Sequence, residues 1–459
     1  MSQSSFSSTK LSDALLTNLA SLGYKQMTAI QEQSLPTVLE GIDLIGQAKT
    51  GSGKTAVFAL GLLSRLEVSN FSVQALVICP TRELADQVAH EVRRLARAIA
   101  NVKVTSICGG VAFAPQLSSL ESGAHIVVGT PGRLQDHINK QTINLSQVNT
   151  LVLDEADRML DMGFQDAVEA ITAELPKQRQ TLLFSATFPE SIQSITQRLM
   201  QAPVMVKIDE QLGNLDIDQT FHKIENTGRL KAVHLLLMEH EPESSIIFCN
   251  TKQEVQELSQ SLRELGFGVL SLHGDLEQRE RDIVLIRFSN KSTSILVATD
   301  VASRGLDIEA VNLVINYQIA RDSEVHVHRV GRTGRAGMAG KAASLYTDSD
   351  AFKLKVLGEQ IGRYIENEPL PAKTVLNKTV SKPAMITLQI NAGKKQKIRP
   401  GDILGALTGE AGLQGSDVGK IKITPMSSYV AVKRSIIKQA LTKLQNGKIK
   451  GRSFKIRSL

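Results

Sequence analysis

The sequence predicts an α/β protein with two similar parallel-sheet lobes followed by a small basic α+β domain. Three observations support this prediction. Short β-branched apolar runs alternate with helical patterns, the runs recur at matching intervals in two halves of the body, and the last 80 residues differ sharply in charge. At 459 residues and 42% hydrophobic content, the chain has enough apolar material for two or three domains rather than one.

The apolar runs have the length of buried strands, and helical patterns separate them, which is typical of parallel sheets covered on both faces. In the first lobe the runs are "IDLIGQ" (42–47), "ALVICP" (75–80), "HIVVGT" (125–130), "TLVLDEAD" (150–157) and "TLLFSAT" (181–187). In the second lobe they are "SIIFCN" (245–250), "GVLSLHG" (268–274), "SILVATD" (294–300) and "LVINY" (313–317). Such folds bind ligands beyond the carboxyl ends of their strands, so we expect the functional residues there.

The two lobes also resemble each other in sequence. "LVICPTRE" (76–83) matches "IIFCNTKQE" (246–254), and "IVVGTPGR" (126–133) matches "ILVATDVASR" (295–304). Cys79 to Thr130 spans 51 residues, and Cys249 to Thr299 spans 50. We therefore expect lobes at 1–208 and 219–370, joined near 209–218, and a third domain at 380–459.

Charge separates the tail from the body. Residues 380–459 contain 16 Lys and Arg against three acids, a net charge of +13, whereas residues 1–379 have a net charge of −6. A tail this basic indicates a polyanionic partner, although a merely solvated basic surface is the ordinary alternative. No apolar run approaches the roughly 18 residues that span a bilayer. The three cysteines lack metal-ligand spacing, so we expect buried thiols in a cytoplasmic protein without a membrane partner.

The segment "QAKTGSGKT" (47–55) has the features of a phosphate-binding loop, with Ala48 where the strict pattern has glycine. It follows a predicted strand and leads into a helical pattern, so backbone N–H groups there can surround phosphates. Lys54 would reach the β and γ oxygens of a nucleotide, and Thr55 would hold Mg²⁺. Asp154 would complete the magnesium shell, and Glu155 would orient or deprotonate the attacking water. A Gly/Ser turn and a charged helix start are the alternatives.

With these motifs in order, residues 1 to about 370 resemble the DEAD-box RNA helicases. The resemblance rests on "GYKQMTAIQ" (23–31), "AKTGSGKT" (48–55), "PTRELA" (80–85), "TPGR" (130–133), "DEAD" (154–157), "SAT" (185–187), "FCNT" (248–251), "ATDVASRGLD" (298–307) and "HRVGRTGR" (328–335). It implies two tandem RecA-like lobes, ATP and Mg²⁺ as cofactors, and ATP hydrolysis coupled to RNA.

The resemblance also assigns nucleotide residues. Gln31 reads adenine with aromatic support from Phe6 and Tyr24, Arg335 is the arginine finger, and Arg332 contacts phosphate. The residues it implies for nucleotide binding are Phe6, Tyr24, Gln31, Ala48, Thr50, Gly51, Ser52, Gly53, Lys54, Thr55, Gly305 and Asp307. Those it implies for catalysis are Lys54, Asp154, Glu155, Ser185, Thr187, His328, Arg332 and Arg335, with the "SAT" segment linking nucleotide state to strand separation.

For RNA, the resemblance implies that ATP and one strand close the lobes together, with contacts to phosphates and 2′-hydroxyls that carry little base information. Unwinding is then local and non-processive. The residues implied in the body are Pro80, Thr81, Arg82, Gly109, Gly110, Thr130, Gly132, Arg133, Asn250, Gln278, Arg281, Thr299 and Asp300.

The tail has the βαββαβ order of an RNA-recognition-motif (RRM) fold. The predicted elements are strand "MITLQI" (385–390), helix "ILGALTGE" (403–410), strands "GKIKIT" (419–424) and "YVAV" (429–432), helix "SIIKQALTKL" (435–444) and strand "SFKIRS" (453–458). Its third strand offers one aromatic residue, Tyr429, so we expect basic loops and edges to hold RNA instead. The candidates are Lys394, Lys395, Lys397, Arg399, Lys433, Lys448, Lys450 and Arg452.

Tail phrases narrow the resemblance to the bacterial DbpA subfamily, whose carboxyl-terminal domain binds a hairpin of 23S ribosomal RNA. They are "KIRPGDILGALTGEAGL" (397–413), "DVGKI" (417–421) and "NGKIKG" (446–451). The implied partners are 23S rRNA and pre-50S particles, and we expect a monomer. The alternatives are an ATP-gated RNA clamp or scaffold without productive unwinding, and another phosphate-loop enzyme such as a GTPase. No Asn/Thr-Lys-x-Asp tetrad for guanine occurs.

Overall fold

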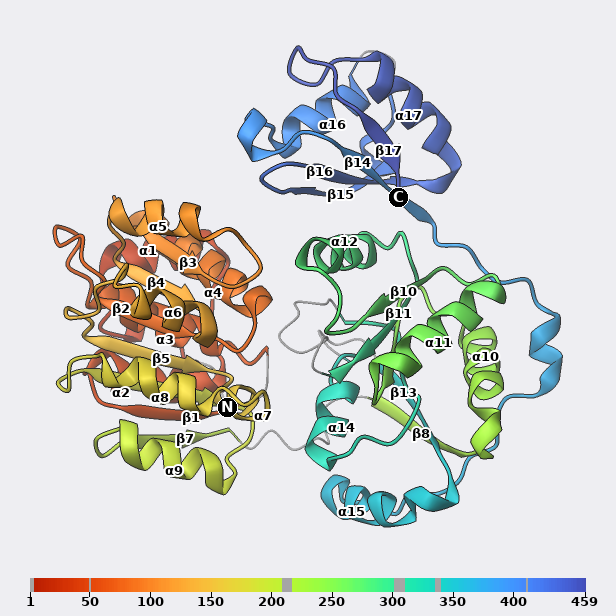
Figure 1. The fold of residues 1–459 in the computed structure, drawn as a ribbon, viewed down its shortest axis with the longest axis horizontal. Helices are drawn as coiled ribbons and strands as arrows, with labels where there is room; N and C mark the ends of the chain where they lie inside the picture. The colour runs from red at the N-terminus through yellow and green to blue at the C-terminus, as the bar shows by residue number, and fades with distance from the viewer. Residues whose placement is uncertain (1–3, 49–50, 209–216, 301–309, 335–339, 410–411) are drawn as a thin grey trace. The chain divides into compact units, whose positions relative to one another are not determined.

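The computed structural model describes residues 4–48, 51–208, 217–300, 310–334, 340–409 and 412–459 (Figure 1). These residues form two compact units that divide between residues 208 and 217. The first unit contains one parallel sheet. The second contains a parallel sheet and, after it in sequence, a small antiparallel sheet. The predicted fold class, two tandem parallel-sheet lobes plus a C-terminal α+β domain, is confirmed.

The sheet of the first unit has seven strands in the order β3-β4-β2-β5-β6-β1-β7, and every pair is parallel. The strands are β1 (Leu44–Gln47), β2 (Ala75–Ile78), β3 (Val104–Ile107), β4 (Ile126–Gly129), β5 (Thr150–Asp154), β6 (Gln180–Ser185) and β7 (Val204–Lys207). Strands β2, β4, β5 and β6 are buried along their whole length, which explains their continuous apolar runs.

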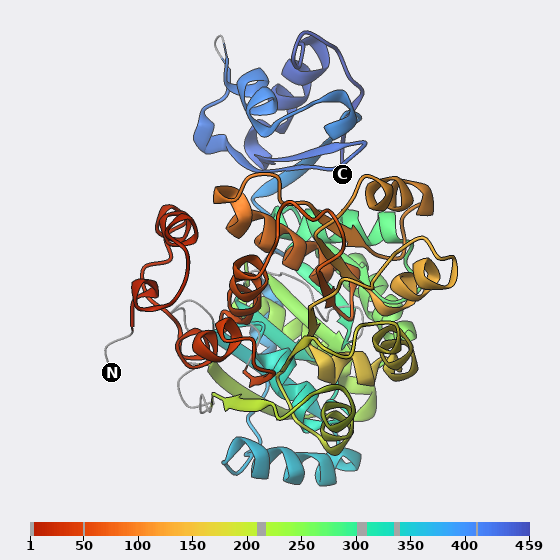
Figure 2. The same cartoon turned by 90° about the vertical axis from the view of Figure 1, so that its left-hand side faces the viewer.

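Two hydrophobic cores lie on the two faces of this sheet. Val152 of β5 belongs to one core, and its neighbours Leu151 and Leu153 belong to the other, because successive strand residues point to opposite faces. The N-terminal segment, red in Figure 2, lies along one side of the unit. The helices are α1 (Asp13–Ser21), α2 (Ala29–Leu39), α3 (Lys54–Ser64), α4 (Arg82–Leu95), α5 (Phe113–Glu121), α6 (Pro131–Asn139), α7 (Ala156–Asp161), α8 (Gln165–Ala173) and α9 (Glu190–Leu199).

The parallel sheet of the second unit has the strand order β10-β11-β9-β12-β13-β8. Its strands are β8 (Ile217–Lys223), β9 (Ser245–Cys249), β10 (Val269–Leu272), β11 (Ile295–Thr299), β12 (Leu313–Asn316) and β13 (Gly340–Tyr346). Its helices include α10 (Arg229–His240), α11 (Lys252–Glu264), α12 (Gln278–Ser289), α14 (Ser323–Val330) and α15 (Ala351–Ile361). The predicted similarity of the lobes appears in the neighbours of matching strands, since β2 lies between β4 and β5 as β9 lies between β11 and β12.

The C-terminal domain has the predicted βαββαβ order. Its strands are β14 (Met385–Ile390), β15 (Val418–Ile423), β16 (Ser428–Lys433) and β17 (Ile456–Ser458), and its helices are α16 (Pro400–Thr408) and α17 (Ile437–Asn446). The strands pair antiparallel in the order β15-β16-β14-β17. Leu388 and Val430, which pair across β14 and β16, are fully buried in the core of this domain.

Alternate residues on the same two strands are buried as well. Thr387 is 0% exposed, and its hydroxyl lies 2.7 Å from the hydroxyl of Ser292 and accepts a hydrogen bond from Asn290 Nδ2 at 3.2 Å. Tyr429 is only 5% exposed. The one aromatic residue of the third strand therefore offers no open ring face for base stacking.

Cys79, Cys108 and Cys249 are buried and carry free thiols, as predicted. Burial raises the pKa of all three thiols, that of Cys108 to about 12. Among the described residues, no helix is both long enough and apolar enough to span a membrane.

Candidate active site

The phosphate-binding loop has the predicted context between a strand and a helix. β1 ends at Gln47 and α3 begins at Lys54. Gly51 and Gly53 adopt φ angles of +88° and +97°, a left-handed conformation that residues with a Cβ rarely take. Thr50, one of the predicted nucleotide-binding residues, lies outside the described residues. The two glycines therefore shape the part of the loop that leads into α3.

Gln31, the predicted adenine reader, is hydrogen-bonded to this loop. Its Nε2 donates to the Gly53 carbonyl at 3.2 Å, and its Oε1 accepts from the Thr28 N–H at 2.9 Å. The Thr28 hydroxyl donates to the Ser52 carbonyl at 2.7 Å. A Cβ added to Gly53 would lie 2.5 Å from Gln31 Nε2. The start of α2 and the phosphate-binding loop thus form one hydrogen-bonded group, and Thr28 is a member that the sequence analysis missed.

Phe6 and Tyr24, the predicted aromatic support, contact each other. Their ring centroids are 6.0 Å apart in an edge-to-face arrangement. Phe6 is buried, and the Tyr24 hydroxyl donates to Glu91 Oε1 at 2.6 Å and accepts from Arg94 Nη2 at 3.0 Å. Through the hydrogen bonds of Tyr24, the two aromatic residues connect the segment before Gln31 to α4.

Lys54 and Asp154 are buried ionisable residues next to the loop. Lys54 Nζ donates to the Ala48 carbonyl at 2.8 Å. Asp154 ends β5, and its Oδ1 is buried without a hydrogen bond in the described part of the chain. Burial raises the pKa of Asp154 to about 7, although the charge of Lys54 acts in the opposite direction.

These features fit a magnesium-bound nucleotide. A buried carboxylate oxygen that lacks a protein partner suits a hard divalent cation, which would replace the lost hydration. Lys54 and the N-terminus of α3 suit phosphate oxygens. Thr55 is the second residue of α3, so Thr55 and Asp154 would hold Mg²⁺, and the metal would neutralise charge on the phosphates.

Glu155, the predicted residue for the attacking water, has φ of +54°, a strained value for a residue with a side chain. Its Oε2 accepts a 2.6 Å hydrogen bond from Arg158 Nη1, and both residues are buried. This ion pair fixes the carboxylate at the start of α7. Arg158 was not among the residues predicted from the sequence, although its position three residues after Glu155 places it on the same helix turn.

Asp157 connects the "DEAD" segment to the "SAT" segment. Its Oδ2 accepts hydrogen bonds from the N–H groups of Ala186 and Thr187, both at 3.1 Å, and from the Thr187 hydroxyl at 3.2 Å. Its own N–H donates to Ser185 Oγ at 3.3 Å. The contact arises because β5 and β6 are paired in parallel, so their carboxyl ends lie side by side. Asp157 was not among the site residues predicted from the sequence.

The predicted RNA residues of the first unit follow three neighbouring strands, β2, β4 and β3. Parallel strands end at the same edge of a sheet, so Pro80, Thr81 and Arg82, then Gly109 and Gly110, then Thr130, Gly132 and Arg133 share that edge. The Thr81 hydroxyl accepts from the Leu84 N–H and caps α4, and Arg133 Nη1 donates to the Val111 carbonyl at 3.1 Å. Side chains of the β2 and β4 loops are therefore fixed by their own helices and by the β3 loop.

In the second unit, Arg329 brings two predicted RNA residues together. Its Nε and Nη2 donate to the two oxygens of Asp300 at 2.6 and 2.7 Å, and Nη2 also donates to Asn250 Oδ1 at 2.8 Å. Arg329 is 1% exposed. His328 and Arg332, on either side of it, were predicted from the sequence as catalytic residues, whereas Arg329 was not.

The remaining predicted residues of this unit lie on separate elements. Thr299 ends β11, and Gln278 begins α12, where its Nε2 donates to Asp282 Oδ1 at 2.9 Å. Arg281 is on the first turn of the same helix. Arg332 is buried in the turn after α14, and its carbonyl accepts from the Val311 N–H at 3.0 Å. Gly305, Asp307 and Arg335 lie outside the described residues.

In the C-terminal domain, two basic loops meet. Lys450 Nζ donates to the Lys397 carbonyl at 3.0 Å, which joins the loop after β14 to the loop before β17. Seven of the eight predicted basic residues belong to these loops: Lys394, Lys395, Lys397, Arg399, Lys448, Lys450 and Arg452. Lys433 does not join them, because it pairs with Met385 at the other end of β14 and forms an ion pair with Asp417.

The class of protein follows from three features: two parallel-sheet lobes, a phosphate-binding loop with a buried lysine, and a neighbouring pair of acids. Together they define a nucleotide-dependent enzyme of the tandem-lobe class. Matches to family models identify the family within this class. Residues 28–195 match the DEAD/DEAH box helicase model, residues 228–337 the helicase conserved C-terminal domain, and residues 387–458 the DbpA RNA binding domain. The chain belongs to the DEAD-box ATP-dependent RNA helicases and carries a DbpA-type RNA-binding domain.

Similar proteins agree along the whole chain. The ATP-dependent RNA helicase DbpA of Escherichia coli (strain K12) is 49% identical over 449 residues, covering 98% of both chains. DbpA of Bacillus subtilis (strain 168) is 37% identical over 99% of both. CshA of Listeria monocytogenes is 44% identical over 80% of this chain and 71% of its own length. The two relatives named DbpA match almost the whole chain, including the tail.

Among solved structures, Saccharomyces cerevisiae Dbp5 bound to RNA and ADP BeF3 is similar with a TM-score of 0.72 at 30% identity. The match covers 82% of this chain and all of the other. The expected ATP-dependent RNA helicase is thus confirmed as the class of enzyme.

Proposed function

We propose that this helicase acts on 23S ribosomal RNA in pre-50S particles during assembly of the large ribosomal subunit, as a monomer in the cytoplasm. ATP binding and hydrolysis would drive local, non-processive unwinding of short duplexes. The observation that carries the proposal is the DbpA-type domain at 387–458, in which two basic loops meet through Lys450 and Lys397. A body whose contacts are to phosphates and 2′-hydroxyls needs such a domain to choose its RNA.

In the first unit, the proposed ATP site follows from the contacts of its residues. Gln31 reads adenine, Lys54 contacts the phosphates, and Thr55 with Asp154 holds Mg²⁺. Glu155, oriented by Arg158, positions the attacking water. The hydrogen bond between Gln31 and Gly53 supports this assignment, because it makes the shape of the phosphate-binding loop depend on the residue that reads the base.

In the second unit, we propose that Arg335 and Arg332 stabilise charge on the transferred phosphoryl group, and that Gly305 and Asp307 contact the nucleotide. Asn250, Gln278, Arg281, Thr299 and Asp300 contact the RNA strand. Arg329 supports two of these by holding the side chains of Asn250 and Asp300.

Crosslinking in cells followed by sequencing of the bound RNA tests the substrate. We expect reads concentrated on one hairpin of 23S rRNA. A triple variant, Lys394→Gln, Lys397→Gln and Lys450→Gln, removes charge from the joined loops and is expected to disperse the reads, while ATP hydrolysis at saturating nonspecific RNA stays near the wild-type rate.

The matched control exchanges three basic residues elsewhere in residues 380–459, Lys382→Gln, Lys422→Gln and Lys438→Gln. It removes the same total charge and should keep the hairpin reads. Reads spread over messenger RNA in the unaltered chain would contradict the rRNA assignment. Specific binding with ATP turnover but without strand separation would favour the RNA clamp instead.

A further inference from the structure

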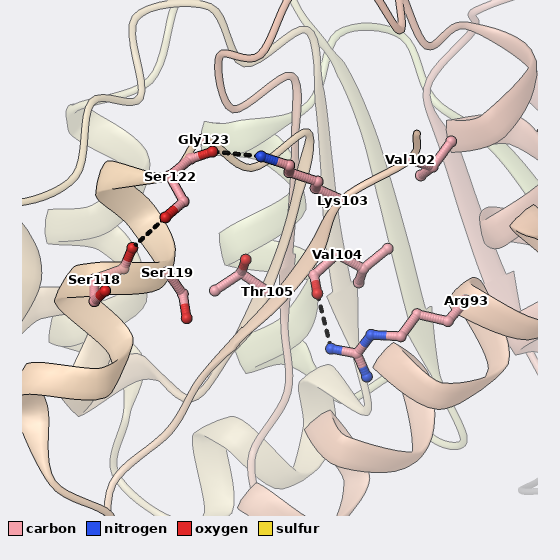
Figure 3. A pocket seen from close by; sticks show the side chains of 9 residues that line it. All are labelled: Arg93, Val102, Lys103, Val104, Thr105, Ser118, Ser119, Ser122 and Gly123. Atoms are coloured by element: carbon pink, nitrogen blue, oxygen red, sulfur yellow. Dashed lines mark hydrogen bonds between the residues drawn. The ribbon is translucent and has the colours of Figure 1, made fainter. Parts of the chain in front are cut away.

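A groove on the first unit lies apart from the loops that follow the strands. It has a volume of about 430 Å³ and crosses the edge strand β3, with Arg93 of α4 on one side and Ser118, Ser119 and Ser122 of α5 and its end on the other (Figure 3). Val104 and Thr105, which begin β3, and Lys103 before them form the floor. The Gly109–Gly110 turn follows the opposite, carboxyl end of this strand, so the groove is separate from the predicted RNA edge.

The described residues that line the groove include two cations and four hydroxyl groups, and no carboxylate. Arg93 and Lys103 are exposed to solvent. Each keeps part of its donor capacity in the groove, since a guanidinium has five N–H groups and an ammonium three. The inner part of the Arg93 side chain is desolvated, which lowers its pKa, and the nearby Asp86 carboxylate partly offsets this effect. An anion in the groove would offset this lost hydration.

Arg93 and Lys103 are also held in place. Arg93 Nη2 donates to the Val104 carbonyl at 2.8 Å, and Lys103 Nζ donates to the Ser122 carbonyl at 2.5 Å and lies 5.0 Å from the centre of the Phe71 ring. Cations fixed in this way lose less conformational entropy when they bind an anion than free side chains do.

Two kinds of macromolecule could contact an edge strand, and the contacts favour nucleic acid. A peptide strand added to β3 would need hydrogen bonds to the outward carbonyls of β3 and pockets for every second side chain of the peptide. The guanidinium of Arg93 already donates a hydrogen bond to the Val104 carbonyl. Its side chain therefore stands where an added strand would pair with β3. The valines of the lining, Val102 and Val104, give little apolar surface for side-chain pockets.

We propose that this groove is an accessory site for the RNA sugar-phosphate backbone, in which Arg93 and Lys103 contact phosphate and Thr105 and Ser118 contact phosphate or 2′-hydroxyl oxygens. The site would bind RNA that extends beyond the strand held at the edge formed by β2, β4 and β3. It would add affinity for longer RNAs without reading their sequence.

Ser119→Asp tests the site by adding a negative charge to its wall. Ser119 is exposed, and its hydroxyl donates to the Pro115 carbonyl within α5, so the change removes no contact with the floor. Fluorescence anisotropy would measure binding of a short single-stranded RNA and of one several times as long, over a range of salt concentrations. Loss of one phosphate contact lowers the salt slope by about 0.7 and the affinity for the long RNA about fivefold at roughly 0.1 M salt.

The short RNA and the ATP turnover at saturating RNA should be unaffected. Ser194→Asp, an exposed helix serine on α9 of the same unit, is the matched control and should leave both RNAs unchanged. Ser118→Asp provides a second variant on the same wall if Ser119→Asp lowers the thermal unfolding midpoint.

Equal affinities of the Ser119→Asp and Ser194→Asp proteins for the long RNA would overturn the proposal, and a protein strand would then be the remaining occupant. Binding of inorganic phosphate in the groove at millimolar concentration with no effect on the affinity for the long RNA would identify a free-phosphate site and also overturn it. Photocrosslinking of 4-thiouridine RNA to the full chain shows directly which residues contact the long RNA. We expect adducts in residues 102–105 or 118–123, and adducts confined to the strand-end loops would contradict the site.

Discussion

Arg329 and Asp300 form a bidentate ion pair, in which Nε and Nη2 of the buried arginine donate to the two oxygens of the partly exposed carboxylate at 2.6 and 2.7 Å. Arg329 Nη1 also donates to the Gln318 carbonyl at 2.9 Å. One side chain of α14 therefore ties together the segments that follow β9, β11 and β12. Its burial makes these contacts necessary, because a buried guanidinium without partners would strongly destabilise the fold.

Arg329→Lys should therefore destabilise the second unit. An ammonium cannot reproduce the planar fork that contacts Asp300 and Asn250 together, and the loss of a hydrogen bond to a charged group costs about 1.5–3 kcal/mol. Urea unfolding followed by circular dichroism should show a lower midpoint. Arg321→Lys, at an exposed position, is the control. Equal midpoints for the two variants would show that Arg329 is not needed for stability.

The pKa of Asp154 predicts pH-dependent magnesium binding. In the folded chain the Asp154 carboxyl keeps its proton up to about pH 7, whereas an ordinary Asp carboxyl loses its proton near pH 3.8. The contribution of this group to folding stability therefore declines as the pH rises from 3.8 to about 7. Mg²⁺ needs the carboxylate and displaces the proton. Its affinity in the presence of ADP should be about tenfold higher at pH 8 than at pH 6.

Isothermal titration at the two pH values, in buffers of different ionisation enthalpy, measures both the affinity and the proton release. Asp154→Asn should reduce the release to that of ADP and Mg²⁺ without the protein. A larger release from this variant would mean that another group of the protein titrates.

Gly53→Ala should prevent nucleotide binding. The added Cβ would lie 2.5 Å from Gln31 Nε2, at a φ of +97°. Gly163→Ala, at φ of +74° with no atom near its added Cβ, is a control for backbone strain alone, which costs roughly 1–3 kcal/mol. Binding of a fluorescent ATP analogue should be lost in the first variant and kept in the second. Equal losses would assign the effect to strain rather than to the contact with Gln31.

Glu155→Gln should slow ATP hydrolysis by about 100-fold or more while ATP still binds, because the amide cannot accept a proton from the attacking water. A steady-state ATPase assay with saturating RNA measures the rate, and Glu174→Gln, an exposed residue at the end of α8, controls for loss of a surface charge. Turnover within a few-fold of the unaltered chain would remove Glu155 from the proposed catalytic residues.

Thr187→Val should lower the rate of RNA unwinding much more than the rate of ATP hydrolysis. The change removes one of three hydrogen bonds to Asp157 Oδ2, and the N–H groups of Ala186 and Thr187 keep the carboxylate in place. We expect unwinding to fall about tenfold, the effect of roughly 1.4 kcal/mol, with ATP turnover within about threefold. Unwinding and ATPase assays on the same duplex measure both rates.

The control for this prediction is Thr172→Val, since the Thr172 hydroxyl donates to the Glu169 carbonyl within α8. A parallel loss of both activities in Thr187→Val would indicate that its hydroxyl acts on the nucleotide site itself.

Much of the fold and site follows from patterns that local sequence contains. Continuous apolar runs predicted buried parallel strands, and the position of Asp154 at the end of such a run predicted its place beside the phosphate-binding loop. The tail strand 385–390 has the predicted bounds. These predictions succeeded because the strand period and the common edge of parallel strands are properties of the backbone rather than of distant contacts.

What the sequence did not reveal depends on contacts between distant residues. Arg329 contacts Asn250 from 79 positions away, and its burial cannot be distinguished in sequence from that of the neighbouring arginines. Asp157 was missed for a similar reason, because its partners belong to β6 and the loop after it. The separation of Lys433 from the other basic residues of the tail depends on strand register, which charge counting does not contain.

The buried thiols of Cys79, Cys108 and Cys249 make the chain convenient for site-specific labelling. Maleimides react with exposed thiolates, and burial both hides these three sulfurs and raises their pKa values, so almost none is ionised at neutral pH. A single cysteine introduced on each lobe should accept a fluorophore while the native cysteines stay in place. Distances between the lobes can then be followed by energy transfer in the otherwise unaltered enzyme.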